Sequence, residues 1–234
     1  MFGLVPSHRL KTEDIKIWRQ QALADTLYSK RREAELKRLT AEAKDKVLAF
    51  LENGPAYVSV SWGKDSVVVA DLCRDFGLPT VWVKVDVRSN PDCPAVATAF
   101  SPQNYLEVRS PPGGDGSTSS LGIKKAVKIV GTNRRITGLR KSESKQRLLR
   151  GSQSTATSCV PIADWTTQQV FAYLQWRRLP IHPAYAMSNG GQFSREFLRV
   201  GAIGGTRGSQ TTGRREWESI YYKDVLCKLF TYQN

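Results

Sequence analysis

Hydrophobic and polar positions follow distinct rhythms along the chain, and each rhythm predicts an element. Over residues 11–52, apolar side chains return every three or four positions, for example at Leu39 and Ala43, which indicates helix. The tripeptide Asn-Gly-Pro at 53–55 ends this pattern. The run AYVSVS (56–61) is rich in β-branched and aromatic residues, and it predicts a buried strand.

A turn, a helix and a second strand follow. Residues 61–66 predict the turn, VVVADLCRDFG (67–77) the helix, and LPTVWVKVDV (78–87) the strand. This succession is a βαβ unit, whose strands are expected to lie parallel under a covering helix. We therefore predict an α/β fold, a doubly wound, Rossmann-like parallel sheet with an N-terminal helical extension.

The second half of the chain gives weaker patterns. Residues 88–120 contain five prolines and predict an irregular segment. ADWTTQQVFAYLQWRRL (163–179) predicts an amphipathic helix, with Asp164 or Thr166 as its N-terminal cap. Residues 190–213 are rich in glycine and basic residues and predict a loop.

Composition narrows the class of protein. With 234 residues, the chain is long enough to bury one sizeable core without disulfides or metals. We expect no transmembrane helix and no signal peptide, because no apolar run is long enough and the N-terminus lacks the signal pattern. The four cysteines are scattered, without a C-x-x-C pair, which favours reduced thiols and a cytoplasmic location over a disulfide framework or zinc site.

The charge is strongly positive, at +14, and points to anionic partners such as nucleotides or nucleic acid. It is concentrated in residues 124–150, which contain ten basic side chains and one acidic, Glu143, a net +9. Residues 1–52 carry only +3, and there a solvated helical face is the plainer interpretation. A basic surface that merely aids solubility remains the alternative for the run 124–150.

The turn Ser61-Trp62-Gly63-Lys64-Asp65-Ser66 is the strongest candidate for chemistry. A glycine between strand and helix lets the backbone approach a ligand, and the first amides of the helix favour an anion. Lys64 adds a charge, and Ser61 and Ser66 add hydroxyl donors. Asp65 fits either a divalent cation or a helix cap. The loop is not a Walker A motif, because Asp65 follows the lysine where that motif has Ser or Thr. The alternative is an ordinary strand–helix turn.

Three further segments follow the loop in order: Thr137–Ser144 with Arg147 behind it, Pro161–Thr166, and Leu179–Tyr185. With the S-x-G-K-D-S loop, they resemble the adenine nucleotide α-hydrolase superfamily of PP-loop ATP pyrophosphatases. Within it, the chain looks most similar to the phosphoadenylyl-sulfate (PAPS) and adenylyl-sulfate reductases.

The resemblance implies a PP-loop-type nucleotide-binding domain over residues 53–234, after a helical extension at 1–52. It implies that ATP or a related adenine nucleotide binds at the loop with Mg²⁺, for which Asp65 is the candidate ligand. Catalytic roles are implied for Lys64, Asp65 and Arg140. Nucleotide contacts are implied for Ser61, Trp62, Gly63, Lys64, Asp65, Ser66, Gly138, Arg140, Ser144, Arg147 and Arg207.

Departures from the family pattern concern its redox centre. Val200–Arg207 matches the segment I-G-C-x-x-C-T-R, but Ala202 and Gly205 stand at the two cysteine positions. We therefore expect no iron–sulfur cluster. No C-terminal Cys-Gly motif is present, and Cys227 is interpreted as a small buried hydrophobe. His182 replaces a family Asn, and a structural hydrogen bond is expected for it.

The resemblance, with the nucleotide motifs retained and the redox cysteines missing, implies an ATP pyrophosphatase that adenylylates an acceptor for transfer of sulfur or another group. The expected acceptor is nucleic acid bound through residues 124–150, with a sulfur-donor protein as a further partner. One alternative is a sulfonucleotide reductase that uses an unusual thiol, such as Cys159 or Cys227. Another is a non-catalytic nucleotide- or nucleic-acid-binding subunit. The acceptor, the transferred group, its donor and the oligomeric state stay open.

Overall fold

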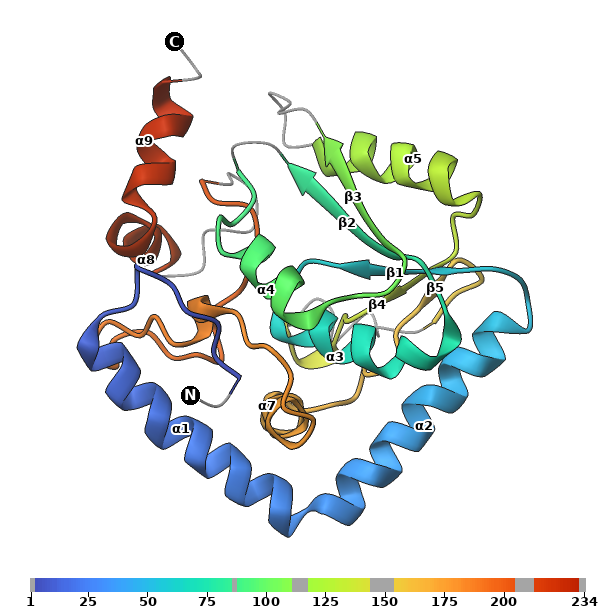
Figure 1. Cartoon of the computed structure of the whole chain (residues 1–234), viewed down its shortest axis with the longest axis horizontal. Coiled ribbons are helices and arrows are strands. Elements are labelled where there is room, and N and C mark those ends of the chain that lie inside the picture. The colour runs from blue at the N-terminus through green and yellow to red at the C-terminus, as the bar shows by residue number, and fades with distance from the viewer. Residues whose placement is uncertain (1–2, 86–87, 111–117, 144–153, 205–212, 232–234) are drawn as a thin grey trace.

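The centre of the molecule is a parallel sheet (Figure 1). The structure is a computed structural model that describes residues 3–85, 88–110, 118–143, 154–204 and 213–231. Five strands pair in the order β3-β2-β1-β4-β5, every pair parallel. The predicted doubly wound α/β fold is confirmed. The strands are β1 (Tyr57–Val60), β2 (Thr80–Val85), β3 (Tyr105–Ser110), β4 (Arg135–Thr137) and β5 (Ser158–Cys159).

The strand order places a crevice beside β1. The chain builds β1, β2 and β3 outward in one direction and then returns to add β4 and β5 on the other side of β1. In open parallel sheets, ligands bind at the carboxyl ends of the strands where the order reverses. Here that position is between β1 and β4, next to the turn that follows β1.

Alternating side chains of the strands pack against helices on both faces of the sheet. On the face covered by α5 (Thr118–Val130), Tyr57 and Val81 pack in one cluster with Ala126 of that helix. Val58 and Trp82 belong to the main core, which also contains the valines of α3 (Lys64–Leu72) and residues of α4 (Cys93–Phe100) and α7 (Thr167–Trp176).

The N-terminal helices brace the main core. α1 (Thr12–Arg31) packs along α7, and α2 (Glu33–Leu51) contacts α3 and β5, so that the two helices form a V in Figure 1. The single helix predicted over 11–52 is therefore corrected to two, because the backbone of Arg32 leaves the helical region (φ −117°, ψ 27°). The division into domains at residue 52 stays a prediction.

The irregular segment predicted over 88–120 is also corrected, because α4 and β3 lie within it. Pro94 stands in the first turn of α4, where it is tolerated because the amide it lacks would have no partner there. The prolines mark the ends of these elements and do not interrupt them. Thr166 is the cap of α7, since its hydroxyl accepts a hydrogen bond from the Gln169 amide at 3.1 Å.

The remaining described helices are α8 (Arg214–Tyr221) and α9 (Lys223–Thr231), with short 3-10 turns at Arg74–Phe76, Lys141–Glu143 and Pro183–Tyr185. Among the residues that the structure describes, no helix has the length and apolar character needed to cross a bilayer.

Candidate functional site

A cavity of about 410 Å³ opens at the turn after β1, in the crevice between β1 and β4. Its floor is the Ser61–Ser66 loop and its far wall is the turn after β4. Residues from the second half of the chain close a third side. The lining residues are Ser59, Val60, Ser61, Gly63, Lys64, Asp65, Ser66, Arg135, Thr137, Gly138, Leu139, Tyr185, Arg199 and Val200.

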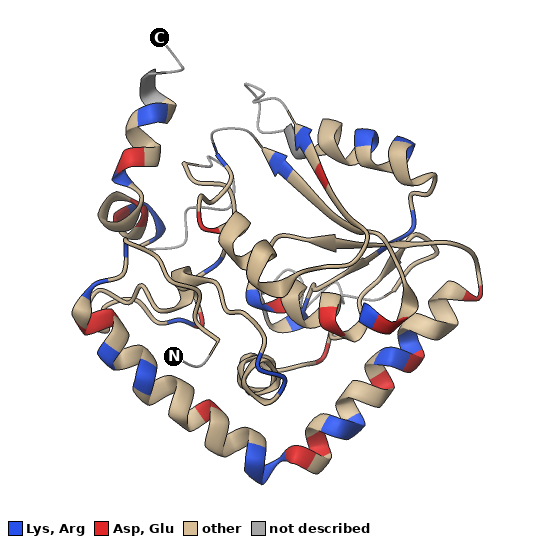
Figure 2. Cartoon of the chain, viewed as in Figure 1, with Lys and Arg blue, Asp and Glu red and all other residues tan. Residues whose placement is uncertain are grey.

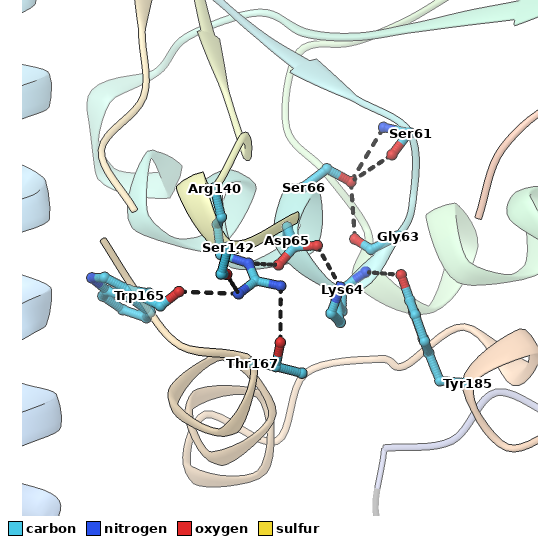
Figure 3. A network of polar contacts seen from close by, with 10 residues as sticks. All are labelled: Ser61, Gly63, Lys64, Asp65, Ser66, Arg140, Ser142, Trp165, Thr167 and Tyr185. Carbon is cyan, nitrogen blue, oxygen red and sulfur yellow. Dashed lines mark hydrogen bonds and ion pairs between the residues drawn. The ribbon is translucent and has the colours of Figure 1, made fainter. Parts of the chain in front are cut away.

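The loop is closed by the hydroxyl of Ser66. This hydroxyl donates to the Gly63 carbonyl at 3.0 Å and accepts from the Ser61 amide at 3.2 Å (Figure 3). Gly63 is the N-cap of α3, which begins at Lys64, three residues earlier than the sequence pattern predicts. The loop therefore presents the N-terminus of a nine-residue helix to the cavity, a position that favours an anion.

Three charged side chains meet beneath this loop. Lys64 Nζ lies 2.7 Å from Asp65 Oδ2, and Arg140 Nε lies 2.6 Å from Asp65 Oδ1. The Lys64 and Arg140 side chains are 3% and 2% exposed, so both cations are held in the protein with Asp65 between them. Lys64 also lies over the Tyr185 ring, with its Nζ 5.2 Å from the ring centroid. We call Lys64, Asp65 and Arg140 the charged triad.

Arg140 points toward α7 in Figure 3. Its Nη1 donates to the Ser142 hydroxyl at 2.9 Å and to the Trp165 carbonyl at 3.0 Å, and its Nη2 donates to the Thr167 hydroxyl at 3.2 Å. Through Arg140 and Asp65, these contacts connect the first turn of α7 to the Ser61–Ser66 loop. The predicted catalytic and nucleotide-binding role of Arg140 stays a prediction, and the geometry favours a positioning role for it.

Asp65 has contacts different from both roles considered from the sequence. Its two oxygens face the cations of Lys64 and Arg140, and the N-terminus of α3 has no side-chain cap. Mg²⁺ prefers an oxygen shell with carboxylates, phosphates and water. A carboxylate already paired on both oxygens does not fit that role. Among the described residues, no group of three or more His, Cys, Asp or Glu side chains could hold a metal ion.

Trp62 turns its side chain away from the loop. The indole is fully buried and packs against the rings of Phe100 and Tyr105, with centroids 5.9 and 5.6 Å away. Its backbone is left-handed, with φ of 60°. For a residue other than glycine, this left-handed backbone costs about 1–2 kcal/mol of conformational energy. Burial of the large indole ring offsets that cost. The indole therefore reaches the core between α4 and β3.

Gly138 allows two backbones to approach closely. A Cβ added there would lie 2.6 Å from the carbonyl carbon and oxygen of Asp65 and 2.8 Å from the amide of Ser66. The loop after β4 thus rests directly on the first turn of α3, and Gly138 also lines the cavity.

We expect Gly138→Ala to lower the free energy of unfolding by about 1–3 kcal/mol, since backbone atoms have to shift to admit the methyl group. Chemical denaturation measures this change. Gly201→Ala is the matched control, because a Cβ at Gly201 meets no atom within 4 Å. Equal stability of the two variants would contradict the close approach.

Several lining residues were not predicted from the sequence. Tyr185 accepts a hydrogen bond from the Lys64 amide at 3.1 Å through its hydroxyl. Arg199 lines the cavity from the glycine-rich segment, and Arg135 and Thr137 line it from β4. Their spacing from the loop in sequence carries no signal. Thr137 and Tyr185 did lie inside segments that the resemblance singled out.

A second cavity of about 230 Å³ lies next to the first and shares Ser59, Val60, Ser61 and Val200 with it. It extends toward the carboxyl end of β2. Its walls are mainly apolar, with a few polar groups. The other lining residues are Trp82, Val83, Val85, Ser89, Asn90, Cys93, Ile123, Gly201 and Ala202.

His182 is fully buried beside this second cavity. Its Nδ1 accepts from the Ala184 amide at 3.1 Å, and its Nε2 lies 3.7 Å from Cys93 Sγ. Burial lowers the pKa of His182 to about 3. The structural hydrogen bond expected from the sequence is present, and the imidazole is neutral near pH 7.

The stability of the protein should depend on this histidine below neutral pH. An unfolded histidine has a pKa of about 6.5, so the unfolded state binds a proton that the folded state lacks. We expect the free energy of unfolding to fall as the pH drops below about 6.5, by up to about 1.4 kcal/mol per pH unit from His182 alone. Urea unfolding at several pH values measures the slope. His182→Asn should flatten it, and an unchanged slope in this variant would contradict the prediction.

In the described part of the basic run, residues 124–143, the basic side chains do not form one continuous surface. Lys124, Lys125 and Lys128 are exposed on α5, where Figure 2 shows basic positions that continue at the carboxyl ends of β2 and β3. Arg134 instead donates to the Ala156 carbonyl at 2.6 Å and lies over a phenylalanine ring. Arg140 belongs to the charged triad. Ser144, Arg147 and Arg207, all predicted nucleotide contacts, lie outside the described residues, as does Gly205.

The four cysteines are free thiols. Cys159 is buried, and its thiol donates to the Lys46 carbonyl at 3.7 Å. Cys227 is exposed on α9, which corrects its interpretation as a buried hydrophobe. Cys93, which the sequence did not single out, is the thiol that lines the second cavity.

Comparison with known proteins relates one part of this sequence to a protein family and the fold to solved structures. The family model "Phosphoadenosine phosphosulfate reductase domain" matches residues 120–208. This range includes the segments at 137–144, 161–166 and 179–185, and begins after the Ser61–Ser66 loop. No curated protein matches the sequence significantly.

Among solved structures, FMN adenylyltransferase of Candida glabrata aligns with a TM-score of 0.51 at 18% identity, over 65% of this chain and 59% of that one. Its complex with ATP aligns with a TM-score of 0.46 at 15% identity, over 60% and 55%. The phosphate complex of phosphoadenylyl-sulfate reductase from Candida auris aligns with a TM-score of 0.47 at 16% identity, over 62% and 87%. The chain thus shares its fold with FMN adenylyltransferase, and its residues 120–208 are similar to the phosphoadenosine phosphosulfate reductase domain.

Proposed function

We propose that this protein is an ATP pyrophosphatase that adenylylates an acceptor, and that the acceptor is a nucleic acid. The observation that carries the proposal is the cavity at the N-terminus of α3, where Lys64 and the glycine-containing loop meet at the switch point of the sheet. The motifs of a nucleotide-binding family support it. Ala202 stands at a cysteine position of the iron–sulfur reductases, which favours chemistry other than their reduction.

The β- and γ-phosphates of ATP bind in the first cavity in this proposal. The N-terminus of α3 and the ammonium of Lys64 supply positive charge there, and Ser61 and Ser66 line the same cavity. The nucleoside occupies the neighbouring second cavity, which offers apolar walls such as Trp82 and polar groups such as Asn90. Ser61 lines both cavities and so lies where the α-phosphate joins the two parts of ATP.

The proposed reaction is a displacement at the α-phosphorus. An oxygen of the acceptor attacks it, a new P–O bond forms, and the bond to the β-phosphate bridging oxygen breaks with its electron pair leaving on pyrophosphate. Donors that are already in place stabilise the charge that develops on the leaving group. Asp65 and Arg140 hold Lys64 and the adjoining loops in position. A sulfur or nitrogen nucleophile then displaces AMP from the acceptor.

A nucleic-acid acceptor fits the basic surface of α5. Lys124, Lys125 and Lys128 are exposed there, and Ile123 of the same helix lines the second cavity. Phosphates bound along α5 would therefore lie beside the nucleotide. A sulfur-donor protein, and a reducing cytoplasmic compartment in which the four free cysteines persist, complete the proposal.

The test is release of labelled pyrophosphate from γ-labelled ATP, alone and with DNA or RNA. The proposal expects release that nucleic acid stimulates and that Lys124→Gln/Lys125→Gln/Lys128→Gln weakens. For every lysine–phosphate ion pair that the substitutions remove, the slope of log affinity against log salt should become shallower by about 0.9 on duplex DNA. Tight ATP binding without turnover in any mixture would instead identify a non-catalytic binding subunit. Sulfite release from a sulfonucleotide, abolished by Cys159→Ala or Cys227→Ala, would identify a reductase.

A further inference from the structure

A series of hydrogen bonds connects the buried side chain of His182 to the Ser61–Ser66 loop. His182 Nδ1 accepts from the Ala184 amide, so this nitrogen carries no proton and the proton of the neutral ring is on Nε2. Nε2–H therefore donates toward Cys93 Sγ at 3.7 Å. The Cys93 thiol in turn donates to the carbonyl oxygen of Ser61 at 3.6 Å.

The protonation states support this direction. Burial raises the pKa of the Cys93 thiol, so the sulfur keeps its proton near pH 7. Burial lowers the pKa of His182, so the ring stays neutral. His182 cannot deprotonate Cys93, because the ring nitrogen that faces the sulfur already carries the proton. The pair is therefore a donor chain and lacks the arrangement of a nucleophilic cysteine with its base.

The series of hydrogen bonds ends at the first residue of the loop. Ser61 precedes Trp62, whose backbone is held at φ 60°. Because a peptide group is planar and trans, a donor that fixes the Ser61 carbonyl also fixes the direction of the Trp62 N–H. Cys93 is the first residue of α4, and His182 precedes the 3-10 turn that contains Tyr185. The hydrogen bonds therefore connect three separate segments of the protein: α4, this turn and the loop that begins at Ser61.

We propose that His182 and Cys93 form a relay that positions the Ser61 carbonyl and thereby holds the loop in its nucleotide-binding conformation. This inference rests on the proposed function for its consequence in nucleotide affinity. Both residues are positioning residues. Cys93 also lines the second cavity, so the relay links the proposed nucleoside position to the proposed phosphate position.

The experiment compares Cys93→Ala, His182→Asn, the double variant and Cys159→Ala. Asn keeps an acceptor near the Ala184 amide but does not reach Cys93, and the family resemblance places Asn at this position. Cys159→Ala is the matched control, since it removes a buried thiol that donates to the Lys46 carbonyl, distant in sequence from the loop. Affinities for ATP and for inorganic pyrophosphate are measured by calorimetry, and amide hydrogen exchange follows residues 61–66.

We expect Cys93→Ala and His182→Asn each to weaken both affinities about fivefold, the equivalent of one modest hydrogen bond. The double variant should be no weaker than either single variant, because the relay is broken once. Loop amides should exchange faster in these variants and unchanged in Cys159→Ala. The infrared S–H stretching band of Cys93, obtained as the difference from Cys93→Ala, should shift in His182→Asn. A His182 ring that only packs against Cys93, without donating to the sulfur, would leave this band unchanged.

Additive effects in the double variant would overturn the relay. So would unchanged affinity and loop exchange, with only thermal stability lowered in all variants. If the wild-type protein binds neither ATP nor pyrophosphate, the proposed function fails, and the relay is then decided by loop exchange and the S–H band alone.

Discussion

Replacing Asp65 by asparagine should lower the free energy of unfolding by about 3–5 kcal/mol. Asp65 lies between Lys64 and Arg140, whose side chains are almost completely buried. Without the carboxylate, two cations remain in a low-dielectric environment without their shared counter-charge. Urea unfolding at neutral pH measures the change.

The matched control is Asp164→Asn. Asp164 pairs with Lys141 at 2.6 Å, the same distance as the Arg140–Asp65 contact, but the side chains are 62% and 35% exposed. Water screens such a pair, and its removal should cost less than about 1 kcal/mol. A similar cost for both variants would show that the charged triad is not a buried ion network.

Replacing Lys64 by methionine should reduce the rate of pyrophosphate release about 100-fold while the protein stays folded. Removing one preorganised donor to a leaving group typically costs this much. Methionine retains the length and apolar stem of lysine, and Asp65 keeps its contact with Arg140. Lys84→Met serves as the control, because Lys84 belongs to β2 and pairs with Glu107. An unchanged rate in Lys64→Met would remove Lys64 from the proposed mechanism.

The sequence predicted the parts of the structure that depend on local patterns. The strand, loop and helix around Ser61–Ser66 are recognisable because period-two and period-3.6 patterns meet at a glycine. The contacts of Asp65 were not predictable, since Arg140 is 75 positions away and only the fold brings it near. α4 and β3 were not predicted, because the five prolines of residues 88–120 indicated an irregular segment. The direction of Trp62 depends on Phe100 and Tyr105, which belong to those two elements.

The contacts of Cys93 and His182 and the second cavity could not be predicted from the sequence, because only the fold brings their residues together. Cys93 and His182 are 89 positions apart, and neither belongs to a motif that predicts contact. A buried cysteine and a buried histidine are individually ordinary. Their proposed role comes from the contact between the two side chains and from the contact of Cys93 with the carbonyl of Ser61.

All nine residues of α3 are buried, including the three polar ones at its start. A helix enclosed on every side has little conformational freedom left to give up when a ligand arrives. The ordering cost of binding is therefore met during folding, and the site is preorganised. Selectivity between anions must then come from the fixed shape and charge of the site. Any movement that closes the site has to occur in the segments around the crevice.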